Sequence, residues 1–101
     1  MEKLILWKVN PAWLAKDRQT RFKSQMMMLE WIKAEIEAKQ HKSWGISANG
    51  MSGYSLTDMS DEDLFVAIAK YQPIIEFKIE TMLDVDECIE CNNRLAKAME
   101  K

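Results

Sequence analysis

The strongest constraint on the fold comes from residues 75–80, where apolar and charged side chains alternate without exception. Successive side chains of a β-strand point to opposite faces of the sheet, so this segment predicts a strand with one apolar and one charged face. The apolar positions are Ile75, Phe77 and Ile79, and the charged positions are Glu76, Lys78 and Glu80. Because unpaired charges are unstable in a core, we expect helices to cover the apolar face and to leave the charged face open.

Residues 4–9 are a second candidate strand, a short apolar run that ends at Asn10 and Pro11. A run of this length and composition suits a central strand of a sheet. Asn10 followed by Pro11 is typical of a helix cap with proline at the first helical position. We therefore expect a short helical segment over residues 12–16.

A long helix is predicted from Asp17 to about Lys39, because this stretch lacks glycine and proline and is rich in helix-forming residues. One apolar stripe should face the core, and it consists of Phe22, Met26, Leu29, Ile32 and Ile36. Met27 and Trp31 lie in a second stripe on nearly the opposite side. That stripe needs a cover, which is either a second copy of the chain or the C-terminal helix of the same chain.

Residues 41–48 and 51–57 predict a β-hairpin, because Asn49 and Gly50 between them favour a type I′ turn. A two-residue loop places Trp44 opposite Ser55. Trp44 belongs to the alternating set that we expect on the helix-covered face, whereas Tyr54 belongs to the set on the open face.

Two further helices are predicted from their capping residues. Ser60 and Asp63 begin a helix that Pro73 terminates, and Asp84 and Glu87 begin the last helix of the chain. The apolar positions of the first are Leu64, Phe65, Ala67, Ile68 and Tyr71. The apolar stripe of the second consists of Val85, Cys88, Ile89, Asn92, Leu95, Ala96 and Met99.

The predicted elements follow the order strand, helix, hairpin, helix, strand, with an additional C-terminal helix. This order predicts a single ferredoxin-like α+β domain over residues 1–101, with both main helices on one face of a four-stranded antiparallel sheet. A single copy cannot cover the other face, so we expect a homodimer or a higher homo-oligomer. By alternation, the main residues of that open face are Leu4, Leu6, Lys8, Tyr54, Leu56, Glu76, Lys78 and Glu80.

Several short motifs along the chain resemble the dimeric α+β barrel superfamily. They are Trp44-Gly45, Gly53-Tyr54-Ser55-Leu56, Asp61-x-Asp63-Leu64, Tyr71-Gln72-Pro73, the strand with Ile75, Phe77 and Ile79, and Asp84-Val85-Asp86-Glu87. The superfamily includes muconolactone isomerases, antibiotic-type monooxygenases and uncharacterised small domains, and the chain is most similar to the last group. The resemblance implies that two copies pair their open faces into a closed barrel. It implies no particular catalytic base or cofactor, because members differ in chemistry.

Five side chains of the open face form the candidate ligand-binding site: Lys8, Tyr54, Glu76, Lys78 and Glu80. A polar pocket enclosed by paired apolar sheets is typical of a small-molecule site, and neighbouring carboxylates and lysines can take part in proton transfer. These charges are equally typical of a solvated edge strand. We therefore predict a small-molecule-binding homodimer that is either a ligand-binding protein or a minor isomerase or monooxygenase; the alternative is a non-catalytic assembly protein whose paired sheets are filled by side chains. No cofactor is predicted.

The pair Cys88 and Cys91 has the spacing of redox and metal sites, but Cys88 falls a full turn inside the last helix. The single histidine, His41, is far from the pair in sequence, so we interpret both cysteines as structural and expect Cys88 to be buried. His41 follows the long helix, where we expect it to cap the helix end or to lie at the surface; the alternative role is a general base.

The 14 basic and 16 acidic side chains give a formal net charge of −2, which does not favour binding to nucleic acid or to an anionic membrane. Residues 1–50 are nonetheless basic and residues 51–101 acidic, an asymmetry that favours self-association or is only a solvated dipole. The long helix begins with a basic cluster consisting of Lys16, Arg18, Arg21 and Lys23, for which acidic residues of a partner subunit are the expected counterpart. Two cysteines and no apolar signal segment favour a cytoplasmic protein.

Overall fold

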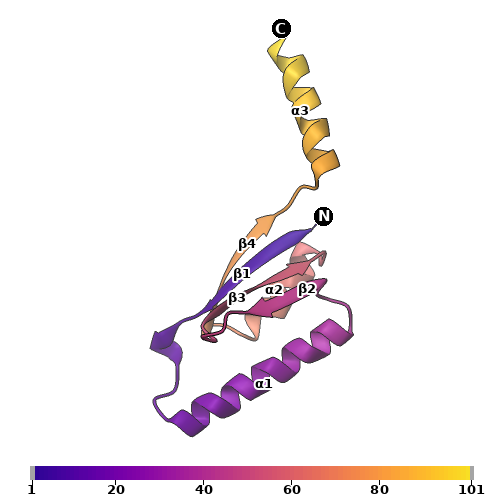
Figure 1. Ribbon diagram of the computed structural model, residues 1–101. Helices are drawn as coiled ribbons and strands as arrows, with labels where there is room; N and C mark the ends of the chain where they lie inside the picture. The colour runs from indigo at the N-terminus through magenta and orange to yellow at the C-terminus, as the bar shows by residue number, and fades with distance from the viewer. Residues whose placement is uncertain (1, 101) are drawn as a thin grey trace.

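The computed structural model describes residues 2–100 and has an α+β architecture (Figure 1). Four antiparallel strands form one sheet in the order β2-β3-β1-β4. The strands are β1 (Lys3–Val9), β2 (Ser43–Ile46), β3 (Ser52–Thr57) and β4 (Ile75–Thr81). The helices are α1 (Arg18–Glu37), α2 (Asp61–Ala69) and α3 (Val85–Met99), with a 3₁₀ turn η1 (Pro11–Trp13) after β1.

The sheet has the two faces that the alternation predicts, except that Ile79, which was expected beneath the helices, is 41% exposed. Strand β1 is central, and it pairs Lys8 with Glu76 and Leu6 with both Lys78 and Tyr54. These side chains therefore share the open face. Residues of both α1 and α2, together with the opposite set of strand residues, line one common space. Both helices thus lie on the same side of the sheet.

The capping residues begin the helices where the sequence predicts. The carboxylate of Asp17 accepts a hydrogen bond from the Thr20 N–H at 2.9 Å, and the Ser60 hydroxyl accepts one from the Asp63 N–H. Asp84 and Glu87 form a reciprocal capping box at the start of α3. After β1, the helical segment predicted over residues 12–16 is only the turn η1.

The covered side of α1 differs from the predicted stripe. Glu35 is its buried residue and is 6% exposed, whereas Phe22 is 62% exposed and Met26 and Ile36 are also exposed. The helix is therefore rotated, and part of its apolar stripe lies beside the covered side. The Trp31 ring lies edge-on to Tyr71 at 5.7 Å between centroids. The alternative that the C-terminal helix covers Trp31 is wrong, because this contact comes from the chain after α2.

The hairpin pairs Trp44 with Ser55 as predicted, but the turn is not type I′. Gly50 has a φ of 75°, whereas Asn49 does not take the positive φ that a type I′ turn requires. Gly53 leaves space for a ring on the helix-covered face, since a Cβ atom there would lie 2.3 Å from the ring of Trp7. Trp44 stacks on Trp7 with 5.9 Å between ring centroids.

Helix α3 projects away from the sheet, and the molecule measures 64 × 28 × 26 Å (Figure 1). Every residue of α3 is exposed, so the prediction of a buried Cys88 is wrong. Phe65 on α2 is also exposed, contrary to the predicted pattern. Within residues 2–100 the buried apolar side chains are Ile5, Leu64, Tyr71 and Ile75. This core is small for a chain of 101 residues.

Candidate functional site

A cavity of about 460 Å³ lies between the two helices and the helix-covered face of the sheet. Its size is within the range of small-molecule sites. Most of its wall is apolar, with Trp7, Trp44, Met28, Leu29, Ile32 and Phe77 as examples. Trp13, Phe22 and two basic residues of the first turns of α1, Arg18 and Arg21, also line it.

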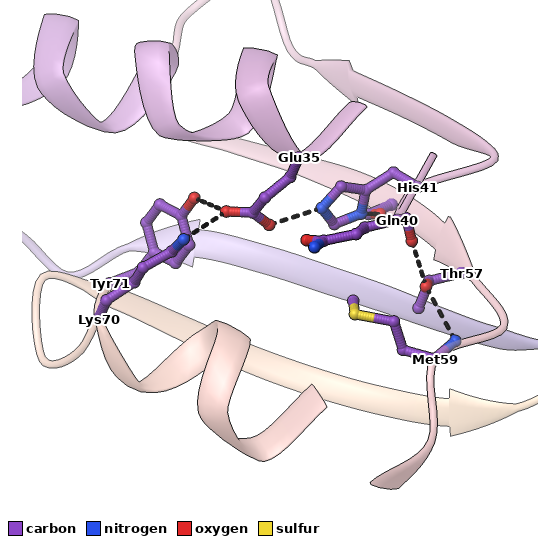
Figure 2. Close-up of polar contacts among 8 residues, drawn as sticks. Glu35, Gln40, His41, Thr57, Met59, Lys70 and Tyr71 are labelled. Atoms are coloured by element: carbon purple, nitrogen blue, oxygen red, sulfur yellow. Dashed lines mark hydrogen bonds and ion pairs between the residues drawn. The ribbon is translucent and has the colours of Figure 1, made fainter. Parts of the chain in front are cut away.

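A cluster of polar side chains contributes to the wall of this apolar cavity, and we call it the Glu35 cluster: Glu35, His41, Ser55, Lys70 and Tyr71. Figure 2 shows Glu35 between His41 on one side and Lys70 and Tyr71 on the other. His41 Nε2 lies 2.8 Å from Glu35 Oε1, and His41 Nδ1 lies 2.5 Å from Ser55 Oγ. A helix, a loop and a strand therefore meet through one imidazole ring.

The second carboxylate oxygen of Glu35 is also occupied. The Tyr71 hydroxyl donates a hydrogen bond to Glu35 Oε2, and the Lys70 ammonium lies 2.9 Å from the same oxygen. Burial alone would raise the pKa of Glu35, but the hydrogen bonds from His41, Tyr71 and Lys70 outweigh it and lower the pKa to about 2. Burial and the hydrogen bond to Glu35 raise the pKa of Tyr71. Glu35 is therefore a carboxylate, and Tyr71 is its neutral donor.

The charge of Glu35 determines the tautomer of a neutral His41. A carboxylate only accepts hydrogen bonds, so the proton must be on Nε2, and Nδ1 is then free to accept the Ser55 hydroxyl proton. Hydroxyl, imidazole and carboxylate thus form a relay in which the carboxylate orients the imidazole base, as in proton-transfer sites. The arrangement can take a proton at Ser55 Oγ and stabilise the resulting imidazolium with Glu35.

Hydrogen bonds to neighbouring backbone groups hold the Ser55–His41–Glu35 relay in place. The fully buried Thr57 donates to the Gln40 carbonyl at 2.5 Å and accepts from the Met59 N–H at 3.1 Å (Figure 2). The nearly buried ammonium of Lys3 donates to the Met59 carbonyl at 2.7 Å. The segment that carries His41 is therefore tied to β3, which fixes the ring beside Ser55.

Trp7 carries a further polar group beside the same cavity wall. Its indole Nε1–H is buried and has no hydrogen-bond partner among residues 2–100. Buried donors without partners are uncommon, because leaving one unsatisfied is unfavourable by about 1–3 kcal/mol. The Trp7 ring lines the cavity, but its N–H is enclosed by protein atoms rather than open to the cavity.

The five predicted site residues all belong to the open face. Lys8 pairs with Glu76 at 3.5 Å and Lys78 pairs with Glu80 at 3.2 Å, and the Tyr54 hydroxyl lies 2.6 Å from the Ser43 hydroxyl. In one copy of the chain these groups are largely exposed. The cavity described above lies on the other side of the sheet, so the five residues do not take part in it.

The Glu35 cluster was not predicted. The expectation that His41 lies at the surface or caps a helix end is wrong, because its side chain is 6% exposed and bonded on both nitrogens. Glu35 was overlooked although it follows Ile32 by three positions and therefore lies near the covered side of α1. The sequence signal for the cluster is an acidic residue near the covered side of a helix, followed closely by the single histidine of the sequence.

Residues 2–100 contain no group of three or more histidine, cysteine, aspartate or glutamate side chains arranged to hold a metal ion. None of the helices in this part of the chain combines the length and the apolarity needed to cross a membrane. Neither the models of known protein families nor the curated proteins give a match to this chain.

Proposed function

We propose that this protein binds a small, largely apolar molecule in the cavity between its helices and its sheet. The observation that carries the proposal is the cavity wall, which is apolar except for a few convergent groups, chiefly Glu35, His41 and Ser55. Ligand pockets combine these two features. Arg18 and Arg21 in the wall favour a ligand with a hydrogen-bond acceptor, such as a carbonyl or a hydroxyl group.

The test is a thermal-shift screen of small phenols, naphthols and apolar carboxylic acids with wild-type protein and two tryptophan variants. Ile32→Trp places a large ring in the cavity, whereas Val66→Trp places the same ring at an exposed position of α2 outside it. We expect stabilising ligands for the wild type and for Val66→Trp, and loss of their effect in Ile32→Trp. Equal shifts in both variants, or no shift for any compound, would contradict the proposal.

A second candidate function is proton transfer on the bound molecule, which would make the protein an isomerase. The observation that favours it is the chain from Ser55 through His41 to Glu35. Ser55 Oγ takes the C–H proton of the ligand as its own proton passes to His41 Nδ1, which leaves an enolate and an imidazolium that the carboxylate of Glu35 stabilises. The imidazolium then returns a proton through Ser55 Oγ to the enolate oxygen, which completes the isomerisation. This requires a substrate with an acidic C–H beside a carbonyl group.

Phenylpyruvate, an aromatic 2-oxo acid, is a suitable probe for this chemistry because its enolisation is followed by absorbance. We expect a protein-dependent rate that His41→Gln abolishes and that Tyr54→Phe, on the open face, leaves unchanged. An equal rate in wild type and His41→Gln would exclude proton transfer through His41 and leave ligand binding as the function of the cavity.

The proposed architecture is the ferredoxin-like fold, with two copies paired through their open faces as in dimeric α+β barrels. The element order and the strand order β2-β3-β1-β4 support the first part, and the exposure of Leu6 and Tyr54 supports the second. Pairing would enclose the candidate pocket of Lys8, Tyr54, Glu76, Lys78 and Glu80; a filled interface would instead indicate an assembly protein without chemistry. Loss of dimer mass in Leu6→Glu tests the pairing.

A further inference from the structure

Helix α3 presents an apolar surface that no other part of residues 2–100 covers. Its large apolar side chains lie on one side of the helix and are all exposed, and they are Val85, Ile89, Leu95 and Met99. Its charged side chains lie on the opposite side. The capping box at Asp84 and Glu87 stabilises the helix end, so α3 is built as a helix before it has a partner. A helix with one uncovered apolar stripe is typical of a docking element.

Helix α1 has a matching surface beside the cavity mouth. Phe22, Met26 and Ile36 are exposed along one side of α1, with the partly buried Leu29 between them. Phe22 and Ile36 are 14 positions apart, as are Val85 and Met99. At 1.5 Å per residue both stripes are about 21 Å long, so they match along their whole length.

The charges of the two helices are complementary in one direction only. Residues 18–27 of α1 contain three basic and no acidic side chains, and residues 85–92 of α3 contain three acidic and no basic ones. The exposed acidic residues in the second half of α1 are Glu30 and Glu37, against Lys33, while the second half of α3 carries Arg94 and Lys97. Opposite charges therefore meet along both halves only when the helices run parallel.

The chain's own α3 cannot easily reach this parallel arrangement. Lys3 is opposite both Thr57 and Thr81, and Thr57 bonds to Gln40 after α1. Helix α3 thus begins at the end of the sheet where α1 ends. The connection between β4 and α3, residues 82–84, spans at most about 10 Å. A fold-back along its own α1 would run antiparallel and would place acidic residues beside acidic residues.

We propose that α3 of a second copy of this chain docks in parallel on the exposed stripe of α1, over the mouth of the cavity. The contact supplies the anionic groups that the basic start of α1 lacks in its own first turn. It also covers apolar surface of α1 and α3 that a single copy leaves exposed, since only four apolar side chains are buried within residues 2–100. Exchange of an identical helix between copies is an established route to dimers. This contact is separate from the open face and does not require a ligand in the cavity.

The first test measures molecular mass by sedimentation velocity over a concentration series. Ile89→Glu adds a charge to the apolar stripe of α3, and Asn93→Glu adds the same charge outside that stripe. Since both residues are exposed in a single copy, neither substitution disturbs the fold. We expect Ile89→Glu to weaken association by at least roughly tenfold and Asn93→Glu to leave it unchanged.

The second test examines the direction of docking through a charge exchange. Arg21→Glu and Asp86→Arg should each weaken association, and the double variant should restore it. A wild-type chain that is monomeric at all concentrations, or an Ile89→Glu variant that associates like the wild type, would overturn the proposal. Association that depends on Leu6 but not on Ile89 would assign the contact to the open face. Ligand-induced thermal shifts are read separately, so failure of the cavity proposal leaves these outcomes unaffected.

Discussion

The two faces of the sheet carry similar carboxylate and ammonium groups in opposite surroundings. On the helix-covered face, Glu35 and Lys70 are 2.9 Å apart, and the Glu35 side chain is 7% exposed. On the open face, Glu76 and Lys8 are 3.5 Å apart, and the Glu76 side chain is 48% exposed. Burial of the ion pair, rather than the types of its residues, therefore determines how much it contributes to stability and to a functional site.

The largest expected effect is the loss of the buried carboxylate. Glu35→Ala should lower the free energy of unfolding by about 3–5 kcal/mol, because it leaves Lys70, His41 and Tyr71 without their common acceptor. Chemical denaturation at pH 7 measures the change. Glu76→Ala is the matched control on the open face, and we expect a loss of less than about 1 kcal/mol there. Equal losses for the two variants would refute the distinction between the faces.

Acid should remove the contribution of Glu35 over a defined range of pH. Its pKa in the folded protein, about 2, is below the ordinary value of 4.5. The carboxylate therefore stabilises the fold fully above pH 4.5 and loses this contribution as the pH falls towards 2. The free energy difference between wild type and Glu35→Gln should shrink by roughly 3 kcal/mol across this range. A difference that stays constant between pH 7 and pH 2.5 would show that Glu35 is not held as described.

The glycines of the hairpin provide a third comparison between the faces. In Gly53→Ala, the new Cβ would lie 2.2 Å from the Gly45 carbonyl and 2.3 Å from the Trp7 ring, and neither can move freely. We expect a loss of about 1–3 kcal/mol in thermal or chemical unfolding. In Gly45→Ala the Cβ would meet the Tyr54 ring at 2.6 Å. The exposed ring can turn away, so a loss as large as that of Gly53→Ala would indicate that the open face is covered.

The smallest expected effect is the loss of an exposed ion pair. Lys8→Ala should change the free energy of unfolding by at most about 1 kcal/mol, because its partner Glu76 remains solvated. Denaturation curves at two protein concentrations measure this change. A larger loss that grows with protein concentration would show that a second copy covers Lys8.

Much of the fold could be predicted from the sequence, because local rules determine it. Alternation between Ile75 and Glu80 set the two faces of β4, and the capping residues Asp17, Ser60 and Asp84 set the helix starts. The turn at Asn49 and Gly50 differed in type, because only Gly50 takes a positive φ. The type of a hairpin turn depends on the number of residues between the paired strands, and a dipeptide motif does not determine this number.

The candidate site could not be predicted in the same way. Glu35, Ser55 and Tyr71 come from three separate elements, and only the packing of α1 against the sheet brings them together with His41. The side of α1 that carries Glu35 is covered although it is not the helix's most apolar stripe, so helical periodicity does not reveal it. The same limit applies to Cys88, whose helix has the pattern of a covered element although no other part of the described chain covers it.

The short connection before α3 has a consequence for the persistence of the chain in a cell. Residues 82–84 are exposed and lie between β4 and α3, as Figure 1 shows. Proteases cleave such accessible, non-helical segments readily. A single cut there would release α3 as a peptide and leave the sheet, α1 and α2 intact. If α3 docks on a second copy as proposed, association would protect this connection from proteases. The rate of proteolysis would then fall as the concentration of the protein rises.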